Sequence, residues 1–342
     1  MKRLSRHRSA AFLAAAASLL VVPAAADAAS IVFVKNNNVW LAKPDGSGQI
    51  RLTRDGTAAN PYYSPTQADN GTIVALRGPD GRATVATFTG GGSKVYRFSP
   101  RGKLLGPPRI SLFEPMPALV PRALAAEVSP NGRTLAISQL LYGTVDKAGG
   151  GRGLQAQALN VVYTDVATGR YKGKSELVLQ QLWSPSWIDN SRLLVFDQYS
   201  QTGAHVYVTS VGRQPAPFYR DPARSTLVEG WNAFSLGGGE LTRKGDKLAL
   251  SRAKLGGGQP TIEILATRGL SAPPEQRCTL AGRDLSLEPG LSWSPDGAVL
   301  SWFEDSGIWS TPVNLDAPGC GLKPRLVIRG GIAPDWGPSG GR

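Results

Sequence analysis

The sequence has 342 residues, of which 41% are hydrophobic and 18% charged, and its formal net charge at pH 7 is +13. That length allows one large domain or two modest ones. The whole chain has two cysteines and two histidines, and one of the histidines, His7, lies in the first 28 residues. The rest of the chain therefore has too few Cys and His residues for a zinc site built from several of them.

Residues 1–28 have the pattern of a signal peptide. The basic start MKRLSRHR precedes the apolar segment SAAFLAAAASLLVV, which is too short to span a bilayer comfortably. Ala26-Asp27-Ala28 has the small-x-small form of a cleavage site, which predicts that residues 29–342 form the mature chain. An uncleaved anchor is the alternative. No later stretch is long and apolar enough for a membrane helix, so we expect an exported protein that is periplasmic, wall-associated or extracellular.

Residues 1–28 hold four basic residues and one acidic residue, so they contribute only a small part of the net charge of +13. The chain therefore stays basic after this segment is removed. A basic surface favours contact with a polyanion such as an acidic polymer of the cell envelope. The basic residues are scattered, however, so a bias in coding composition is the alternative. We expect a monomer with no nucleic-acid partner.

The rest of the sequence indicates an all-β fold. The whole chain contains 41 glycines and 26 prolines, and turn signals break the apolar runs after residue 28 every few residues. Its clearest unit is WSPDGAVLSWFEDSGIWSTPV (293–313). There an aromatic residue ends one strand, Pro-Asp-Gly makes a tight turn, and two further strands follow.

The start of this unit occurs six times in the chain, counting the unit itself, and the two ends of the chain complement each other. We place the starts at Tyr63, Val128, Trp187, Leu241, Trp293 and Trp336. The segment 31–44 aligns without a gap with 300–313, so the mature chain opens on the second strand of a unit whose first strand is C-terminal. These features predict a six-bladed β-propeller over residues 29–342, closed by pairing the C-terminal strand with the N-terminal blade. A β-sandwich, the alternative, does not explain the complementary ends.

The turn motifs resemble the WD-like repeats of the TolB-type β-propeller family. The resemblance is carried by WSPDG (293–297), VSPNG (128–132) and PYYSP (61–65), together with IRLTRDGTAANPYYSP (50–65), which is similar to the strand that links blades in that family. It covers about residues 30–342, the propeller only, without the N-terminal TolB domain. The resemblance implies an exported propeller that binds other proteins, such as peptidoglycan-associated lipoproteins.

Motifs for catalysis are scarce. His205 is the only histidine after residue 28, and its alternating segment GAHVYV favours a packing role. GRYKGKS (169–175) is one residue too short for a phosphate loop. We therefore predict no catalytic residue, no metal ligand and no cofactor. Cys278 and Cys320, the only cysteines, are expected to form a structural disulfide in an oxidising compartment, with two unpaired thiols as the alternative.

The candidate binding residues lie between the second and third strands of the blades. These loops share a face with the loops that link blades, and polar loops on a rigid scaffold are typical of a recognition surface. The candidates for the mouth of the central channel are Lys35, Asn36, Asp197, Gln198, Tyr199, Arg252, Glu304 and Asp305.

Two functions from different classes fit this sequence. The first is a secreted, non-catalytic scaffold that binds a protein or a cell-envelope polymer through this face. The alternative is a propeller enzyme of the lactonase, lyase or quinoprotein dehydrogenase type, with an axial metal or cofactor for which Asp197, Glu304 and Asn36 could supply oxygen ligands. Convergence of carboxylates and amides from at least three blades on the axis, within a few ångströms of one another, would favour the enzyme. A wide, water-filled or Arg-lined channel would favour binding.

Overall fold

The computed structural model describes residues 29–78, 93–110, 119–146, 152–172, 182–197, 205–220, 227–228, 231–232, 234–254, 259–282, 284–285 and 290–338. The predicted signal peptide lies outside this part. Among the residues described, no helix is long and apolar enough to cross a membrane.

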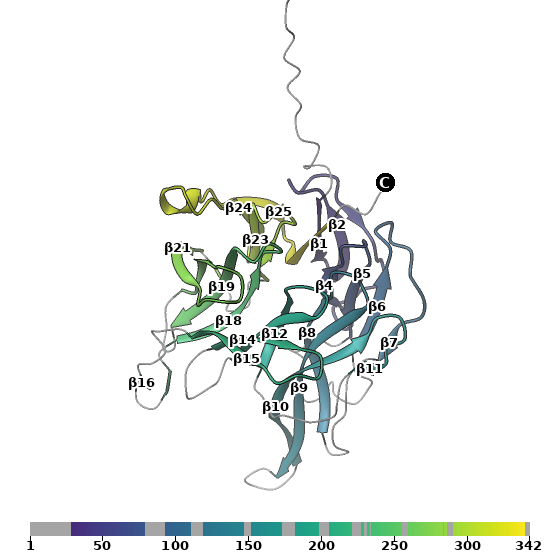
Figure 1. Cartoon of the computed structure of the whole chain (residues 1–342). Coiled ribbons are helices and arrows are strands. Elements are labelled where there is room, and N and C mark those ends of the chain that lie inside the picture. Colours follow the sequence, from purple (N-terminus) through teal and green to yellow (C-terminus); the bar gives the residue numbers. More distant parts are fainter. Residues whose placement is uncertain are drawn as a thin grey trace, which may run out of the picture.

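The described residues form six four-stranded antiparallel sheets around a central axis (Figure 1). We number these blades in chain order and give the innermost strand first. Blade 1 is β26 (Ile332–Pro338), β1 (Ala29–Lys35), β2 (Asn38–Ala42) and β3 (Ile50–Arg51). Blade 2 is β4 (Tyr62–Gln67), β5 (Ile73–Arg77), β6 (Lys94–Phe98) and β7 (Arg109–Ile110). Blade 3 is β8 (Leu119–Val128), β9 (Thr134–Asp146), β10 (Arg152–Asp165) and β11 (Tyr171–Lys172).

The other three blades follow the same order. Blade 4 is β12 (Leu182–Trp187), β13 (Arg192–Asp197), β14 (His205–Ser210) and β15 (Ala216–Arg220). A two-stranded hairpin, β16 (Leu227–Val228) and β17 (Trp231–Asn232), precedes blade 5, which is β18 (Phe234–Leu241), β19 (Lys247–Lys254), β20 (Thr261–Ala266) and β21 (Glu275–Ala281). Blade 6 is β22 (Ser292–Trp293), β23 (Val299–Glu304), β24 (Gly307–Pro312) and β25 (Arg325–Arg329), with the 3₁₀ turn η4 (Pro318–Gly321) before its last strand.

The two ends of the chain close the ring, as the sequence predicts. The C-terminal strand β26 pairs antiparallel with β1, and Trp336 lies opposite Ile31. Trp336 is buried, and its indole nitrogen donates to Ser301 Oγ of blade 6 at 2.9 Å. The six innermost strands contact one another in cyclic order, from β26 through β4, β8, β12, β18 and β22 back to β26. Closure of this kind removes the exposed sheet edge that an open array of blades would leave.

The alignment of the two ends is confirmed, and one of the six starts needs correction. Phe33 pairs with Trp40 in blade 1 as Trp302 pairs with Trp309 in blade 6, so the two tryptophans are equivalent. In blade 2, however, the residue equivalent to Trp293 is Gln67, because its neighbour Ala68 begins the turn. Tyr63 lies four residues earlier. An aromatic-Ser-Pro sequence before the true turn produced the misalignment.

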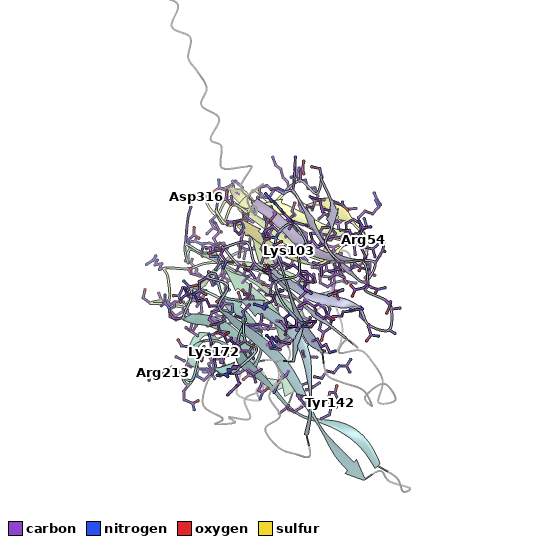
Figure 2. The ribbon with its side chains drawn as sticks, turned by 90° about the vertical axis from the view of Figure 1, so that its right-hand side faces the viewer. Arg54, Lys103, Tyr142, Lys172, Arg213 and Asp316 are labelled. Atoms are coloured by element: carbon purple, nitrogen blue, oxygen red, sulfur yellow. A yellow bond between two sulfur atoms is a disulfide. The ribbon has the colours of Figure 1, made fainter. Side chains whose placement is uncertain are left out.

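Blade 3 extends well beyond the other blades. Its strands β9 and β10 have 13 and 14 residues and pair from Thr134–Asp165 out to Asp146–Arg152, so they form a long hairpin (Figures 1 and 2). Figure 2 also shows that the basic residues Arg54 and Lys103 lie far from Lys172 and Arg213.

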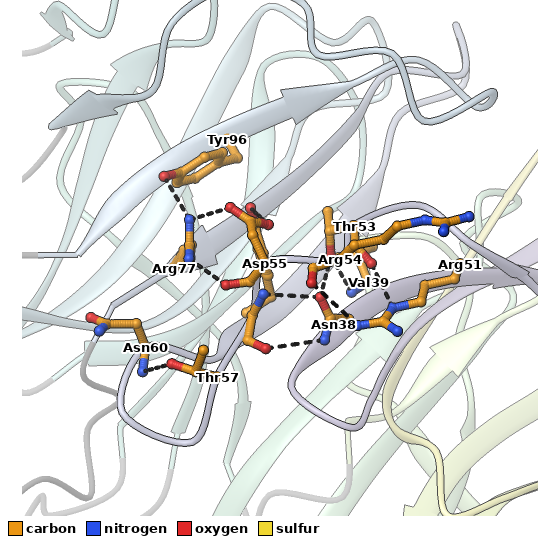
Figure 3. A network of polar contacts seen from close by, with 12 residues as sticks. Asn38, Val39, Arg51, Thr53, Arg54, Asp55, Thr57, Asn60, Arg77 and Tyr96 are labelled. Carbon is orange, nitrogen blue, oxygen red and sulfur yellow. Dashed lines mark hydrogen bonds and ion pairs between the residues drawn. The ribbon is translucent and has the colours of Figure 1, made fainter.

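The link from blade 1 to blade 2 is held by Asn38, which is 1% exposed. Its Oδ1 accepts hydrogen bonds from Gly56 N (3.0 Å) and Thr53 Oγ1 (3.1 Å), and its Nδ2 donates to Asn36 O at 2.7 Å. Further along, Arg77 bonds both Asp55 and the Tyr96 hydroxyl (Figure 3). The polar residues at this end of blade 1 therefore fix the connection between two blades.

Cys278 and Cys320 are joined by a disulfide bond in the structure. Cys278 lies on β21 of blade 5 and Cys320 in η4 of blade 6, so the bond connects neighbouring blades near their outer strands. Cys320 is 2% exposed and packs in the same hydrophobic cluster as Trp293 and Trp302.

Candidate axial site

In blades 2 to 6, the innermost strand leads into a tight turn, of which Ser-Pro-Asp-Gly in blade 6 is the clearest example. In blade 6, Ser294 N donates to Val299 O at 2.8 Å, and Gly297 N donates back to Ser294 O at 2.7 Å. Gly297 has a φ of 72°, a conformation that favours glycine. Asp296 Oδ1 accepts from Ser294 Oγ at 2.6 Å and from Ala298 N at 3.0 Å. The turn therefore fixes the direction of the residues just before it.

We call the residue before each turn the reference residue and the residue preceding it the axial residue. The reference residues of blades 1 to 6 are Trp336, Gln67, Val128, Trp187, Leu241 and Trp293. The axial residues are Asp335, Thr66, Glu127, Ser186, Glu240 and Ser292. Their equivalence rests on register, because the axial residues pair with the corresponding residues of the second strands, namely Val32, Val74, Ala136, Leu194, Ala249 and Ser301.

A left-handed residue lies two positions before the axial residue in five blades. These residues are Ala333, Ser64, Ser184, Gly238 and Gly290, with φ between 44° and 136°. A positive φ is unfavourable for serine and alanine, so the surrounding ring must impose it. The packing there is tight. A Cβ on Gly238 would lie 2.5 Å from Ser184 Oγ of the neighbouring blade.

Five of the six seams between blades are closed by the same hydrogen bond. The side-chain oxygen of an axial residue accepts the backbone N–H of the next blade's reference residue. The pairs are Asp335 with Gln67 (2.6 Å), Thr66 with Val128 (3.3 Å), Glu127 with Trp187 (2.9 Å), Glu240 with Trp293 (3.1 Å) and Ser292 with Trp336 (2.9 Å). In blade 4, the buried Ser186 hydroxyl has no hydrogen-bond partner within the described structure.

Carboxyl and hydroxyl groups alternate around this ring. Blades 1, 3 and 5 have Asp335, Glu127 and Glu240, whereas blades 2, 4 and 6 have threonine or serine. A hydroxyl is sufficient to close a seam, as Thr66 and Ser292 show. Enclosing a carboxylate is costly. The seam bond alone therefore does not explain why three carboxyl groups face the axis.

The three carboxyl groups line one cavity of about 20 Å³ on the axis. Other residues of its wall are Gln67, Trp187, Trp293 and Trp336, and Asp69, Arg243, Ser294 and Pro295 from the turns. A cavity of this size holds about one or two water-sized groups. It lies on the face formed by the turns between first and second strands. The binding residues predicted from sequence lie on the opposite face, in the loops between second and third strands.

Enclosure by protein raises the pKa of all three carboxyl groups. Burial, opposed by hydrogen bonds from Gln67 N and Ser292 Oγ, raises the pKa of Asp335 to about 6. Burial and the nearby charge of Asp335 raise the pKa of Glu127 to about 8. Burial, with the charges of Glu127 and Asp335, raises the pKa of Glu240 well above its usual value. At pH 7 the cavity thus holds an ionised Asp335 beside a protonated Glu127.

Arg243 brings a positive charge to this cavity. It lies two residues after the reference residue of blade 5, where blades 1, 3 and 6 have proline, and its charge acts on all three carboxyl groups. Its Nη2 donates to Asp69 Oδ1 of blade 2 at 2.9 Å. The site therefore combines three carboxyl groups of raised pKa with one guanidinium group. Such carboxyl groups can accept and donate protons near neutral pH.

No three His, Cys, Asp or Glu side chains in the part of the chain that the structure describes are grouped so that they could hold a metal ion. A cavity of about 20 Å³ is also too small for a quinone cofactor.

The residues predicted from sequence lie at the other end of the blades, mostly in structural contacts. Lys35 Nζ reaches Gln49 of the outer part of blade 1, at 3.5 Å, and Asn36 O accepts the amide of Asn38. Arg252 forms an ion pair with the buried Glu263 at 2.8 Å, and Glu304 accepts the indole N–H of Trp302 at 3.0 Å.

The other candidates add little to that picture. Asp197 is half-buried at the end of β13, and Asp305 is exposed in the turn after β23. Gln198 and Tyr199 lie outside the described residues. A channel mouth built from this set stays a prediction.

The interpretation as a non-catalytic scaffold was wrong. The observation against it is that carboxyl groups from three blades line a single axial cavity. The sequence analysis missed the axial residues because each is an ordinary polar residue before a turn. Aligning the repeats on the turn glycine, which blades 2, 3, 5 and 6 share, would have placed Thr66, Glu127, Glu240 and Ser292 in one column.

No protein-family model and no curated protein matches the sequence. Among solved structures, a periplasmic gluconolactonase of Pseudomonas aeruginosa is 14% identical, with a TM-score of 0.46, over 87% of this chain and 83% of the other. An oligogalacturonate lyase in complex with manganese is 12% identical, with a TM-score of 0.48, over 85% and 70%. A prolyl endopeptidase is 14% identical, with a TM-score of 0.43, and this chain spans 35% of its length. Likenesses this distant concern the propeller fold and carry no argument about activity.

Proposed function

We propose that this protein is a propeller enzyme of the lactonase or lyase type, which cleaves a carbon–oxygen bond by general acid–base catalysis in the axial cavity. The observation that supports the proposal is that Asp335, Glu127 and Glu240, from alternate blades, line one cavity with pKa values pushed apart by their surroundings. Two carboxyl groups with different pKa values are the usual arrangement for a base and an acid.

The roles follow from the protonation states at neutral pH. Asp335, ionised at pH 7, is the base that removes a proton from an attacking water or from carbon. Glu127, protonated at pH 7, donates its proton to the leaving oxygen as the carbon–oxygen bond breaks. The proton then passes from Asp335 back to Glu127 through solvent, which restores both groups. Because the cavity holds only one or two water-sized groups, the reacting atoms enter it and the rest of the substrate lies at the mouth.

The proposal is tested by turnover of a substrate panel at different pH values. Lactone opening releases a proton, which a pH-stat records, whereas elimination creates a conjugated double bond that absorbs in the ultraviolet. We expect kcat/KM for one class to rise with an apparent pKa of about 6 and fall with one of about 8. Absence of turnover of both classes across this range would contradict the proposal.

Two further assignments remain proposals. We assign the propeller to the TolB type, on the support of its Ser-Pro-Asp-Gly-like turns and their spacing in the sequence. We also propose that the protein is exported, which agrees with the disulfide between Cys278 and Cys320, because such bonds persist in oxidising compartments. Contact with a protein or an anionic envelope polymer stays a prediction.

A further inference from the structure

An ion pair lies across the mouth of the axial cavity. Arg243 Nη2 and Asp69 Oδ1 are 2.9 Å apart, although the two residues are 174 positions apart in sequence. They belong to blades 5 and 2, which are three places apart in a ring of six and therefore opposite each other. Both side chains line the cavity. The pair thus spans the axis above the three carboxyl groups.

Both members of this pair depart from the repeat. They occupy the position two residues after the reference residue, which is proline in blades 1, 3 and 6 (Pro338, Pro130 and Pro295). Blade 4 has an aspartate there, Asp189, but it pairs with Arg192 of its own turn at 2.7 Å. Charges of opposite sign at this position in two opposite blades are therefore a specific feature of the cavity mouth.

The pair is easily exchanged for another partner. The side chains of Arg243 and Asp69 are 36% and 56% exposed, and ion pairs at such sites contribute little to stability because water and salt screen them. Separation of Asp69 would leave a guanidinium group beside the cavity. A planar guanidinium binds a carboxylate with two parallel hydrogen bonds, so an incoming carboxylate can replace that of Asp69.

We propose that Arg243 binds the carboxylate group of the substrate, and that Asp69 occupies this place on Arg243 when no substrate is bound. The inference rests on the proposed function and names its substrate class: a small molecule with a carboxylate next to the bond that is cleaved. Binding of the carboxylate opens the mouth and places the neighbouring carbon–oxygen bond against Glu127 and Asp335. Asp69 is thereby an internal competitor that sets the affinity for the substrate.

Binding can be measured without turnover, with glycolate as the probe and its neutral analogue glycolamide as the ligand control. Chemical-shift titrations at pH 7 should show that Asp69→Asn binds glycolate about fivefold more tightly than the wild type, because an exposed competing ion pair has been removed. Arg243→Gln should bind at least about tenfold more weakly, and Arg243→Lys should recover part of the affinity. Glycolamide should not bind.

Arg192→Gln is the matched control, because Arg192 is a comparably exposed arginine that pairs with the aspartate equivalent to Asp69 but does not line the cavity. It should bind glycolate as the wild type does. Equal affinity of the wild type and Arg243→Gln, or no gain in Asp69→Asn, would overturn the inference. If glycolate binds as described but neither lactone opening nor elimination is detected, the proposed function fails while the anion site stands.

Discussion

The odd-numbered and even-numbered blades close their seams with different chemistry. Glu127, Glu240 and Asp335 use a carboxyl oxygen to accept the next blade's N–H, whereas Thr66 and Ser292 use a hydroxyl. The hydroxyl is a small neutral acceptor for this hydrogen bond. The carboxyl is an acceptor whose pKa is raised by its burial. A hydroxyl is therefore sufficient to join neighbouring blades. The carboxyl groups add titratable protons to the axial cavity, which assembly of the ring does not require.

The largest expected effect is on turnover. Glu127→Gln keeps an oxygen for Trp187 N but has no proton to donate, so kcat should fall by about 10²- to 10⁴-fold with little loss of stability. Glu275→Gln, at an exposed carboxylate on β21, is the control and should leave kcat unchanged. A Glu127→Gln enzyme with wild-type kcat would show that carboxyl and hydroxyl blades do not differ in function.

The second effect is a stability that falls as pH rises. An acid with a raised pKa binds its proton more tightly in the folded state, so its stabilising contribution is complete below its unfolded pKa and is lost as pH rises through its folded pKa. For Glu127 this window runs from 4.5 to about 8. The melting temperature should therefore be lower at pH 8 than at pH 5 by about 5 °C or more. Glu127→Gln should reduce this dependence, and an unchanged pH profile in that variant would count against the burial of a titrating group.

A smaller effect concerns the residue that holds Glu127 in place. Trp187 donates its backbone N–H to the Glu127 carboxyl and its indole N–H to the Glu127 carbonyl at 2.8 Å. Trp187→Phe leaves that carbonyl without the indole donor and should lower the free energy of unfolding by about 1 to 3 kcal/mol in urea denaturation. Trp293 bonds Glu240 in the same way, so Trp293→Phe should have a similar cost. A cost in only one of the two variants would show that the carboxyl blades are not equivalent.

The smallest effect distinguishes the hydroxyl blades from one another. Thr66→Val removes the acceptor for Val128 N and should cost about 1 kcal/mol. Ser186→Ala removes a buried hydroxyl without a partner and should change stability by less than about 0.5 kcal/mol. Chemical denaturation of both variants side by side gives the comparison, and equal costs would contradict the assignment of an open seam at blade 4.

The fold was predictable because it depends on local repetition, and the axial site was not because it depends on long-range convergence. Segment 31–44 aligns with 300–313, and the repeat that starts at Trp336 has no second strand after it. These two observations were enough to infer that the two ends of the chain form one blade. Asp335, Glu127 and Glu240 are about 100 to 200 residues apart and share no motif. The error at Tyr63 also hid Thr66 and Gln67 from the comparison, so the alternation around the ring could not be read.

The most direct measurement of the central claim is a ¹³C NMR titration of the side-chain carboxyl groups in protein labelled at Glu and Asp. One glutamate resonance should titrate with an apparent pKa of about 8 and be absent from Glu127→Gln, and one aspartate should titrate at about 6 and be absent from Asp335→Asn. If every carboxyl resonance has titrated below a pH of about 5, the axial groups are ordinary ionised carboxylates, and the acid–base account of this cavity is wrong.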